Sequence, residues 1–207
     1  MARSLTRRRL LGLDRSGGAP PESRRGAPLH PWTIPNAIGF VRLALIPVFL
    51  VLALSSGDGR DTAASILYAV IGGTDYLDGI AARVTGQYSR LGALLDPITD
   101  RLLVVSGVIV CWKFDLLPRW ALAVLAAREV LMLVLSRIAF KRGMDLDIKM
   151  LGRWAVWPTM FALFLAMVST TWVAEALLYL GLAMTLGATA EYLADGWREL
   201  RRPSSSA

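Results

Sequence analysis

The chain has very few cysteine and histidine residues, whose sulfur and nitrogen atoms most often form disulfides, bind metals or act as nucleophiles and bases. Among 207 residues there is one cysteine, Cys111, and one histidine, His30. A single cysteine excludes an internal disulfide framework and a metal cluster built on cysteine. A single histidine leaves a Ser–His or Cys–His mechanism with only one candidate base. That histidine stands just before Pro31 and Trp32, in a segment typical of a membrane interface rather than of a catalytic site.

Long polar segments are scarce in the centre of the chain, where apolar runs dominate. Hydrophobic residues make up 55% of the sequence and the mean hydropathy is +0.48, which is typical of a membrane protein. No long stretch alternates between polar and apolar residues, which disfavours a β-barrel. Six runs approach the roughly 20 residues that span a bilayer as a helix, at 37–54, 63–84, 94–112, 120–140, 154–169 and 172–193. The predicted fold is therefore all-α: an integral membrane six-helix bundle with an N-terminal interfacial segment.

Basic residues, which give the chain a net charge of +7, gather in alternate connections. The amino-terminal tail, the second and fourth loops and the carboxy-terminal end are rich in arginine or lysine, and the other connections are poor in both. Because positively charged loops stay on the cytoplasmic side, both termini are predicted to be cytoplasmic. Residues 1–28 are predicted to be a disordered basic tail, 29–200 the membrane domain and 201–207 a carboxy-terminal tail.

Four aspartates interrupt the second and third apolar runs, at Asp75, Asp78, Asp96 and Asp100. On a helix, the spacings i, i+3 and i, i+4 place each pair on one face. The connection between these runs is short, so the two helices can be antiparallel neighbours with the carboxylate pairs facing each other. Carboxylates at such close range repel one another, and one or two divalent cations would balance them. All-oxygen ligands favour Mg²⁺ or Mn²⁺ over Zn²⁺.

Several interpretations of this cluster are open. Carboxylates that hold hard divalent ions commonly bind phosphates and stabilise a phosphate leaving group, and Arg83 and Arg90 would contact phosphate oxygens. The nearby glycines and alanines would admit a nucleotide to the backbone, although small residues in membrane helices also serve close packing. Intramembrane carboxylates also occur in ion or proton pathways. The third and sixth runs carry few polar residues before their cytoplasmic ends, which favours an enzyme over an ion-binding carrier.

The spacing of the acidic motif resembles a known signature. The order Asp75-x2-Asp78-Gly79-x2-Ala82-Arg83-x8-Gly92-x3-Asp96-x3-Asp100 is similar, at every fixed position, to that of the CDP-alcohol phosphatidyltransferase family. The segment "TIPNAIGFVRLALIPVF" also resembles the family's first helix and its interfacial segment. The resemblance covers residues 30–197, and the six-helix prediction agrees with the family's fold.

The resemblance implies a reaction and a role for each motif residue. In the family, CDP-diacylglycerol passes its phosphatidyl group to an alcohol with release of CMP, at a metal site open to the cytoplasmic leaflet. Asp75, Asp78 and Asp96 would hold the metal ions, with Asp100 assisting and acting as base toward the acceptor hydroxyl. The donor-binding positions would be Gly79, Ala82, Arg83 and Gly92. The expected partners are CDP-diacylglycerol, an alcohol and the lipids of the plasma membrane, with no nucleic acid; homodimers are common in the family.

The basic residues beyond the third run bear on the acceptor alcohol. Phosphatidylglycerophosphate synthases, which use glycerol 3-phosphate, hold the acceptor phosphate with basic side chains. The candidates here are Arg128, Arg137, Lys149 and Arg153. Arg128 with Glu129 resembles a pair in those synthases, and a mutual ion pair inside the bundle is the alternative. Glycerol 3-phosphate is the favoured acceptor.

Two departures from those synthases favour another acceptor. They usually have lysine where this chain has Arg101, and a Gly-Lys-x-Lys-Thr segment where this chain has "LGRWAVW". The stretch "SRLGALLDPITDRL" is also similar to a subgroup that includes cardiolipin synthases. Their acceptor, phosphatidylglycerol, needs fewer phosphate-binding cations. Cardiolipin synthase is therefore the alternative function, and an ion-binding membrane carrier is a distant one.

Overall fold

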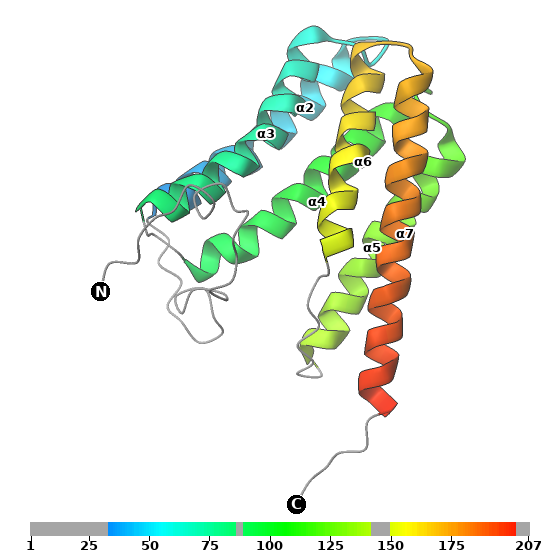
Figure 1. Ribbon diagram of the computed structural model, residues 1–207. Helices are drawn as coiled ribbons and strands as arrows, with labels where there is room; N and C mark the ends of the chain where they lie inside the picture. The colour runs from blue at the N-terminus through cyan, green and yellow to red at the C-terminus, as the bar shows by residue number, and fades with distance from the viewer. Residues whose placement is uncertain (1–32, 86–88, 142–149, 202–207) are drawn as a thin grey trace, which may run out of the picture. The chain divides into compact units, whose positions relative to one another are not determined.

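The computed structural model describes residues 33–85, 89–141 and 150–201, and over those segments the chain is helical, with no strand (Figure 1). The helices are α2 (Ile34–Ser55), α3 (Thr62–Thr85), α4 (Arg90–Lys113), α5 (Arg119–Lys141), α6 (Met150–Val168) and α7 (Trp172–Arg201). The predicted number of helices is confirmed, and each predicted run lies inside one helix except for Ser169, which follows α6. The predicted interfacial segment before Thr33 and the tails, apart from Arg201, lie outside the described residues.

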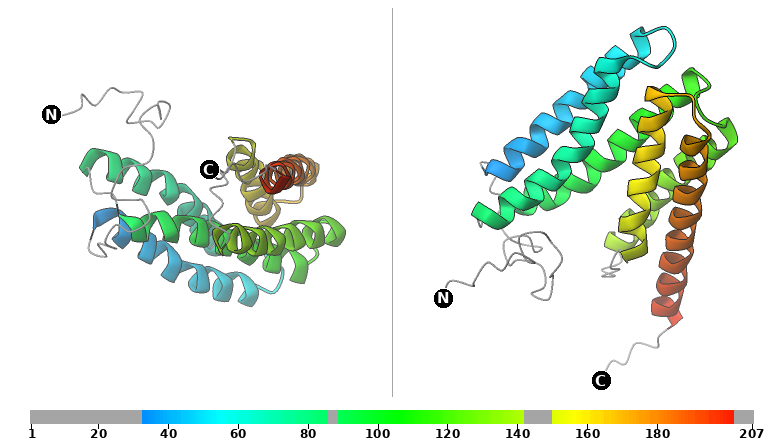
Figure 2. Two further views of the ribbon diagram at one scale, coloured as in Figure 1. Left: turned by 90° about the horizontal axis from the view of Figure 1, so that it is seen from below. Right: turned by 45° about the horizontal axis from the view of Figure 1, so that its top comes forward.

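The helices belong to two compact units. The first contains α2, α3 and α4 as far as Ser106. Within it, α2 and α3 lie side by side as an antiparallel pair (Figure 1; Figure 2). Phe49 of α2 packs against Tyr68 of α3, with ring centroids 5.1 Å apart, and Ile71 and Leu103 are fully buried. Burial of these apolar side chains holds the acidic stretch of α3 on a fixed scaffold.

The second unit contains the loop Ser56–Asp61 and the chain from Gly107 onward. Helix α6 runs alongside α7, and α5 also contacts α7 (Figure 1; Figure 2). The α6–α7 contact is close at Gly181, because a Cβ there would lie 2.9 Å from the backbone nitrogen of Thr159. Glycine at this position lets the two backbones approach, as small residues do where membrane helices pack.

Replacing Gly181 with alanine is expected to destabilise the protein by about 1–3 kcal/mol, because the new methyl group meets backbone that has little room to move. Thermal unfolding of the purified protein measures the loss. Gly73→Ala in α3 is the matched control, since a Cβ at Gly73 would have no atom within 4 Å. Equal melting temperatures for the two variants would contradict the packing described for α6 and α7.

Two of the described helices are long and apolar enough to cross a bilayer. They are α2, with a mean hydropathy of 2.5, and residues Trp172–Ala194 of α7, with 1.5. Shorter apolar stretches occur at Thr62–Thr74 and Ala155–Val168. Large apolar side chains also lie on the outer surface of α2, where Val41 and Val51 are exposed by 58% and 68%. Contiguous exposed apolar surface of this kind is typical of a face covered by lipid or by another protein.

Candidate active site

The carboxylates predicted to form the site come from α3 and α4. Asp96 and Asp100 lie one turn apart on α4, so they share a face as predicted, and both are half-buried. Asp75 and Asp78 lie in the last three turns of α3, but their side chains are outside the described part of the structure. The same holds for the side chains of the donor-binding candidates, Gly79, Ala82 and Arg83. The convergence of all four carboxylates therefore stays a prediction.

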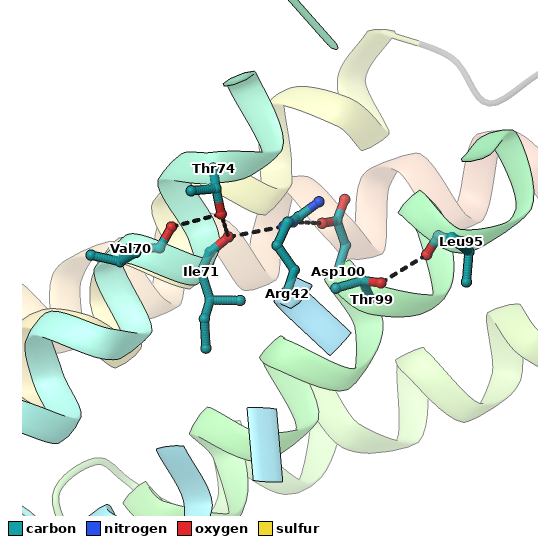
Figure 3. A network of polar contacts seen from close by, with 7 residues as sticks. All are labelled: Arg42, Val70, Ile71, Thr74, Leu95, Thr99 and Asp100. Atoms are coloured by element: carbon teal, nitrogen blue, oxygen red, sulfur yellow. Dashed lines mark hydrogen bonds and ion pairs between the residues drawn. The ribbon is translucent and has the colours of Figure 1, made fainter. Parts of the chain in front are cut away.

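Asp100 is held by an arginine that the motif does not contain. Arg42 in the middle of α2 donates from Nη2 to Oδ1 of Asp100 at 3.0 Å. Its Nε donates to the backbone carbonyl of Ile71 in α3 at 3.1 Å. Figure 3 shows the guanidinium lying between these two acceptors, which come from different helices. Arg42 therefore connects all three helices of the first unit at the level of the acidic motif.

The two ends of this ion pair differ in exposure. The Arg42 side chain is 1% exposed, whereas that of Asp100 is 33% exposed. Removing an arginine from water costs several kcal/mol, and the carboxylate together with the Ile71 carbonyl offsets that cost. Asp100 is thus anchored on its buried side and accessible on the other, as a group that contacts a substrate must be.

Arg42 is a candidate functional residue that does not belong to the acidic motif and was not predicted from it. The signal was present in the sequence, because Arg42 is the one charged residue in the otherwise apolar helix α2. A lone charge inside a membrane-length apolar helix is a candidate functional residue by itself, since burying it without a partner is costly.

A second polar cluster fixes the start of α4. Ser89 Oγ accepts a hydrogen bond from the backbone N–H of Gly92 at 2.9 Å and so caps the helix. The same hydroxyl donates to Oδ1 of the buried Asn36 in α2 at 2.7 Å. A Cβ at position 92 would lie 2.8 Å from that oxygen and 3.2 Å from the Ser89 hydroxyl. Gly92 therefore admits the Asn36 side chain, a packing reason for glycine that is independent of the donor contact predicted from the family.

We expect Gly92→Ala to destabilise the protein by about 1–3 kcal/mol. The methyl group forces Asn36 away from Ser89 and leaves buried polar groups without a hydrogen-bond partner. Thermal unfolding measures this cost. Asn36→Ala removes the amide that obstructs the new methyl group, so Gly92→Ala should destabilise this variant less than it destabilises wild type. The double variant is therefore expected to lose less unfolding free energy than the sum of the two single losses. Strictly additive losses would show that the two residues do not compete for this space.

The structure describes one of the basic residues predicted to bind the acceptor. In the second unit, Arg128 of α5 forms an ion pair with the adjacent Glu129, the alternative stated above. Its Nε also donates to Oγ1 of Thr189 in α7 at 3.1 Å. Within the described part of the chain, the remaining Nη2 amino group has no hydrogen-bond partner. The side chains of Arg137 and Arg153, and all of Lys149, lie outside the described residues.

The donor chemistry of α4 fits a hard divalent cation. Asp96 and Asp100 present two partly exposed carboxylates one turn apart, and oxygen is the ligand that Mg²⁺ and Mn²⁺ prefer. The described side chains contain no group of three acidic, histidine or cysteine residues able to hold a metal. A complete site would therefore need the carboxylates of α3 as well.

Comparison with known proteins agrees with the motif. The family model for CDP-alcohol phosphatidyltransferase matches residues 32–187. The chain is 37% identical over 167 residues to the CMP-forming cardiolipin synthase of Streptomyces coelicolor, covering 77% of each chain. It is 30% identical over 190 residues to the CDP-diacylglycerol–glycerol-3-phosphate 3-phosphatidyltransferase of Bacillus subtilis, covering 82% of this chain and 98% of that one. The enzyme of the same name from Pseudomonas fluorescens is 30% identical over 179 residues, covering 81% of this chain and 92% of that one. The chain belongs to the CDP-alcohol phosphatidyltransferase family.

Proposed function

We propose that this enzyme transfers the phosphatidyl group of CDP-diacylglycerol to the hydroxyl of glycerol 3-phosphate, releasing CMP. The observation that carries the chemistry is the placement of Asp100. Its carboxylate is anchored by the buried Arg42, and its exposed side lies one turn from Asp96. A carboxylate held in this way can accept the proton of an attacking hydroxyl without first having to be ordered.

The other motif residues take the roles that the family implies. Asp75, Asp78 and Asp96 hold Mg²⁺ or Mn²⁺ with the help of Asp100, and Gly79, Ala82 and Arg83 bind the donor, with Gly92 allowing its close approach. When bound, the metal neutralises charge on the donor pyrophosphate and on the departing CMP. The protein's own contribution is to orient the carboxylates and to take up the proton at Asp100. The metal dependence that is general in the family supports this assignment.

We also propose that the domain, residues 29–200, lies in the plasma membrane with both termini and the active site facing the cytoplasm. The apolar helices α2 and α7 support the placement, and the alternation of basic connections supports the orientation. A homodimer, common in the family, is part of the same hypothesis.

Arg128 supports glycerol 3-phosphate as the acceptor. Thr189 and Glu129 fix the orientation of its guanidinium, and its Nη2 amino group, which has no hydrogen-bond partner among the described residues, is suited to a phosphate oxygen. The relatives from Bacillus subtilis and Pseudomonas fluorescens, whose names specify glycerol 3-phosphate, match this chain over most of their length. We propose that Arg137, Lys149 and Arg153 assist in binding the same phosphate.

Phosphatidylglycerol is the second candidate acceptor, which would make the product cardiolipin. The ion pair with Glu129 offsets the charge of Arg128 and so weakens its attraction for a phosphate dianion. In addition, the cardiolipin synthase of Streptomyces coelicolor shares 37% identity with the chain.

Product analysis by mass spectrometry decides between the two acceptors. Purified enzyme with CDP-diacylglycerol and Mg²⁺ or Mn²⁺ is given glycerol 3-phosphate or phosphatidylglycerol in separate reactions. We expect phosphatidylglycerophosphate from the first, and Arg128→Gln should raise the KM for glycerol 3-phosphate by at least about tenfold through loss of a charged hydrogen bond. Product only from phosphatidylglycerol would overturn the first assignment in favour of the second.

A further inference from the structure

We propose that Arg42 is a positioning residue that fixes the reacting carboxylate of Asp100 in its position relative to α3. This inference rests on the proposed function and extends it to a residue outside the family's acidic signature. Among the described residues, Arg42 donates a hydrogen bond to each of the helices that carry the signature, α3 and α4.

The point of contact on α3 lies beside the acidic motif. Ile71, whose carbonyl accepts from Arg42 Nε, precedes Asp75 by one helical turn. The same guanidinium holds Asp100 on α4. Figure 3 shows Arg42 reaching from α2 to both. One rigid, planar group therefore couples the position of Asp100 to the segment of α3 that contains Asp75 and Asp78 in the sequence.

A purely structural role does not account for an arginine at this position. Replacing a buried ion pair by apolar residues of similar volume is often neutral or stabilising, because the desolvation cost disappears. Helix α2 has a mean hydropathy of 2.5, so an apolar side chain at position 42 would suit its composition. The buried charge is instead directed at a carboxylate that is one-third exposed. The arrangement fixes that carboxylate with a buried charge where an apolar side chain would avoid the desolvation cost, and such departures from apolar packing are expected at functional sites.

The guanidinium fork matters as well as its charge. Lysine would supply a cation but not two donors in a fixed plane, so it could not hold Asp100 and the Ile71 carbonyl in one geometry. A misplacement of about 1 Å in a catalytic group can lower turnover on the order of 10²-fold.

The positive charge of Arg42 also repels a metal ion bound by Asp100. Removing that charge should therefore leave metal affinity unchanged or raise it.

The test compares Arg42→Met, Arg42→Lys and the control Thr99→Val in the full-length enzyme. Thr99 is adjacent to Asp100, and among the described residues its hydroxyl donates within α4, to the carbonyl of Leu95 at 3.0 Å, as Figure 3 also shows. CMP release gives kcat and the KM for CDP-diacylglycerol, Mn²⁺ binding is followed by electron paramagnetic resonance, and circular dichroism reports folding.

We expect kcat of Arg42→Met to fall on the order of 10²-fold, with the KM for CDP-diacylglycerol within about threefold of wild type. Mn²⁺ should bind as tightly as in wild type or more tightly, and the control should behave as wild type. A parallel loss of helicity, Mn²⁺ affinity and kcat in both Arg42 variants would identify a merely structural residue. Should Arg42→Met alone fail to fold, Arg42→Lys decides: a folded, fully active lysine variant overturns positioning, and a folded, slow one supports it.

The two hypotheses fail in different ways. An active wild type whose Arg42 variants keep full turnover removes the positioning role alone. A wild type that releases no CMP with any acceptor removes the proposed function, and this inference with it.

Discussion

Replacing Asp100 with asparagine is expected to lower turnover by about 10²–10⁴-fold, the contribution typical of a general base. Asparagine has the same shape, and its carbonyl oxygen can still accept the hydrogen bond from Arg42. The substitution therefore removes the negative charge and the ability to accept a proton, while the surrounding packing is kept. Initial rates of CMP release with saturating donor and acceptor measure the effect.

Loss of the charge also leaves Arg42 buried beside a neutral partner. Breaking a fully buried ion pair at one end commonly costs about 3–5 kcal/mol; because the Asp100 side chain is 33% exposed, the Asp100→Asn enzyme should lose less than this but still melt at a lower temperature. Adding Arg42→Met should restore part of that stability without restoring turnover. Asp115→Asn, at an exposed ion pair with Arg119, is the matched control and should leave both quantities near wild type. Turnover near the wild-type rate in Asp100→Asn would remove Asp100 as the base.

Removing divalent metal is expected to abolish activity. Without a divalent cation, the charge of the carboxylates and of the donor pyrophosphate is only partly balanced by arginine, and the CMP leaving group loses its electrostatic stabilisation by the metal. Chelation with EDTA should reduce CMP release to background, and added Mg²⁺ or Mn²⁺ should restore it. Zn²⁺ should restore much less, since the predicted ligands are all oxygen.

Whether the aspartates bind the metal can be tested without measuring turnover. Mn²⁺ binding should weaken in Asp96→Asn and stay unchanged in Asp115→Asn, which lies in the loop before α5. Activity that survives exhaustive chelation would contradict the metal-dependent mechanism, whatever the acceptor.

The sequence predicted the helices well because their signal is local. A run of apolar residues long enough to span a bilayer specifies a helix by its composition, and the predicted runs agree with the observed helices to within a few residues at most ends. The i, i+4 spacing of Asp96 and Asp100 is local in the same sense, so their shared face on α4 followed from helix geometry. The carboxy-terminal end was least well predicted. Helix α7 continues to Arg201, because the polar residues after Leu193 end the apolar run without breaking the helix.

Contacts between helices could not be predicted in the same way. Nothing in the spacing of the first helix indicates that Arg42 reaches both Ile71 and Asp100, because that depends on how three helices pack. The reason for glycine at position 92 was also non-local, since the neighbouring atoms belong to Asn36, far away in the chain. For Arg128, the sequence offered two partners, a substrate phosphate or Glu129, and only the structure shows the ion pair with Glu129.

The proposed reaction is the transfer of a phosphatidyl group from CDP-diacylglycerol to an alcohol. The most direct test is CMP release by the purified enzyme with donor, acceptor and divalent metal supplied together and with each omitted in turn. We expect CMP only in the complete reaction, in a one-to-one ratio with the phospholipid product. Absence of CMP with glycerol 3-phosphate, phosphatidylglycerol and inositol phosphate alike, or equal release without any acceptor, would contradict it.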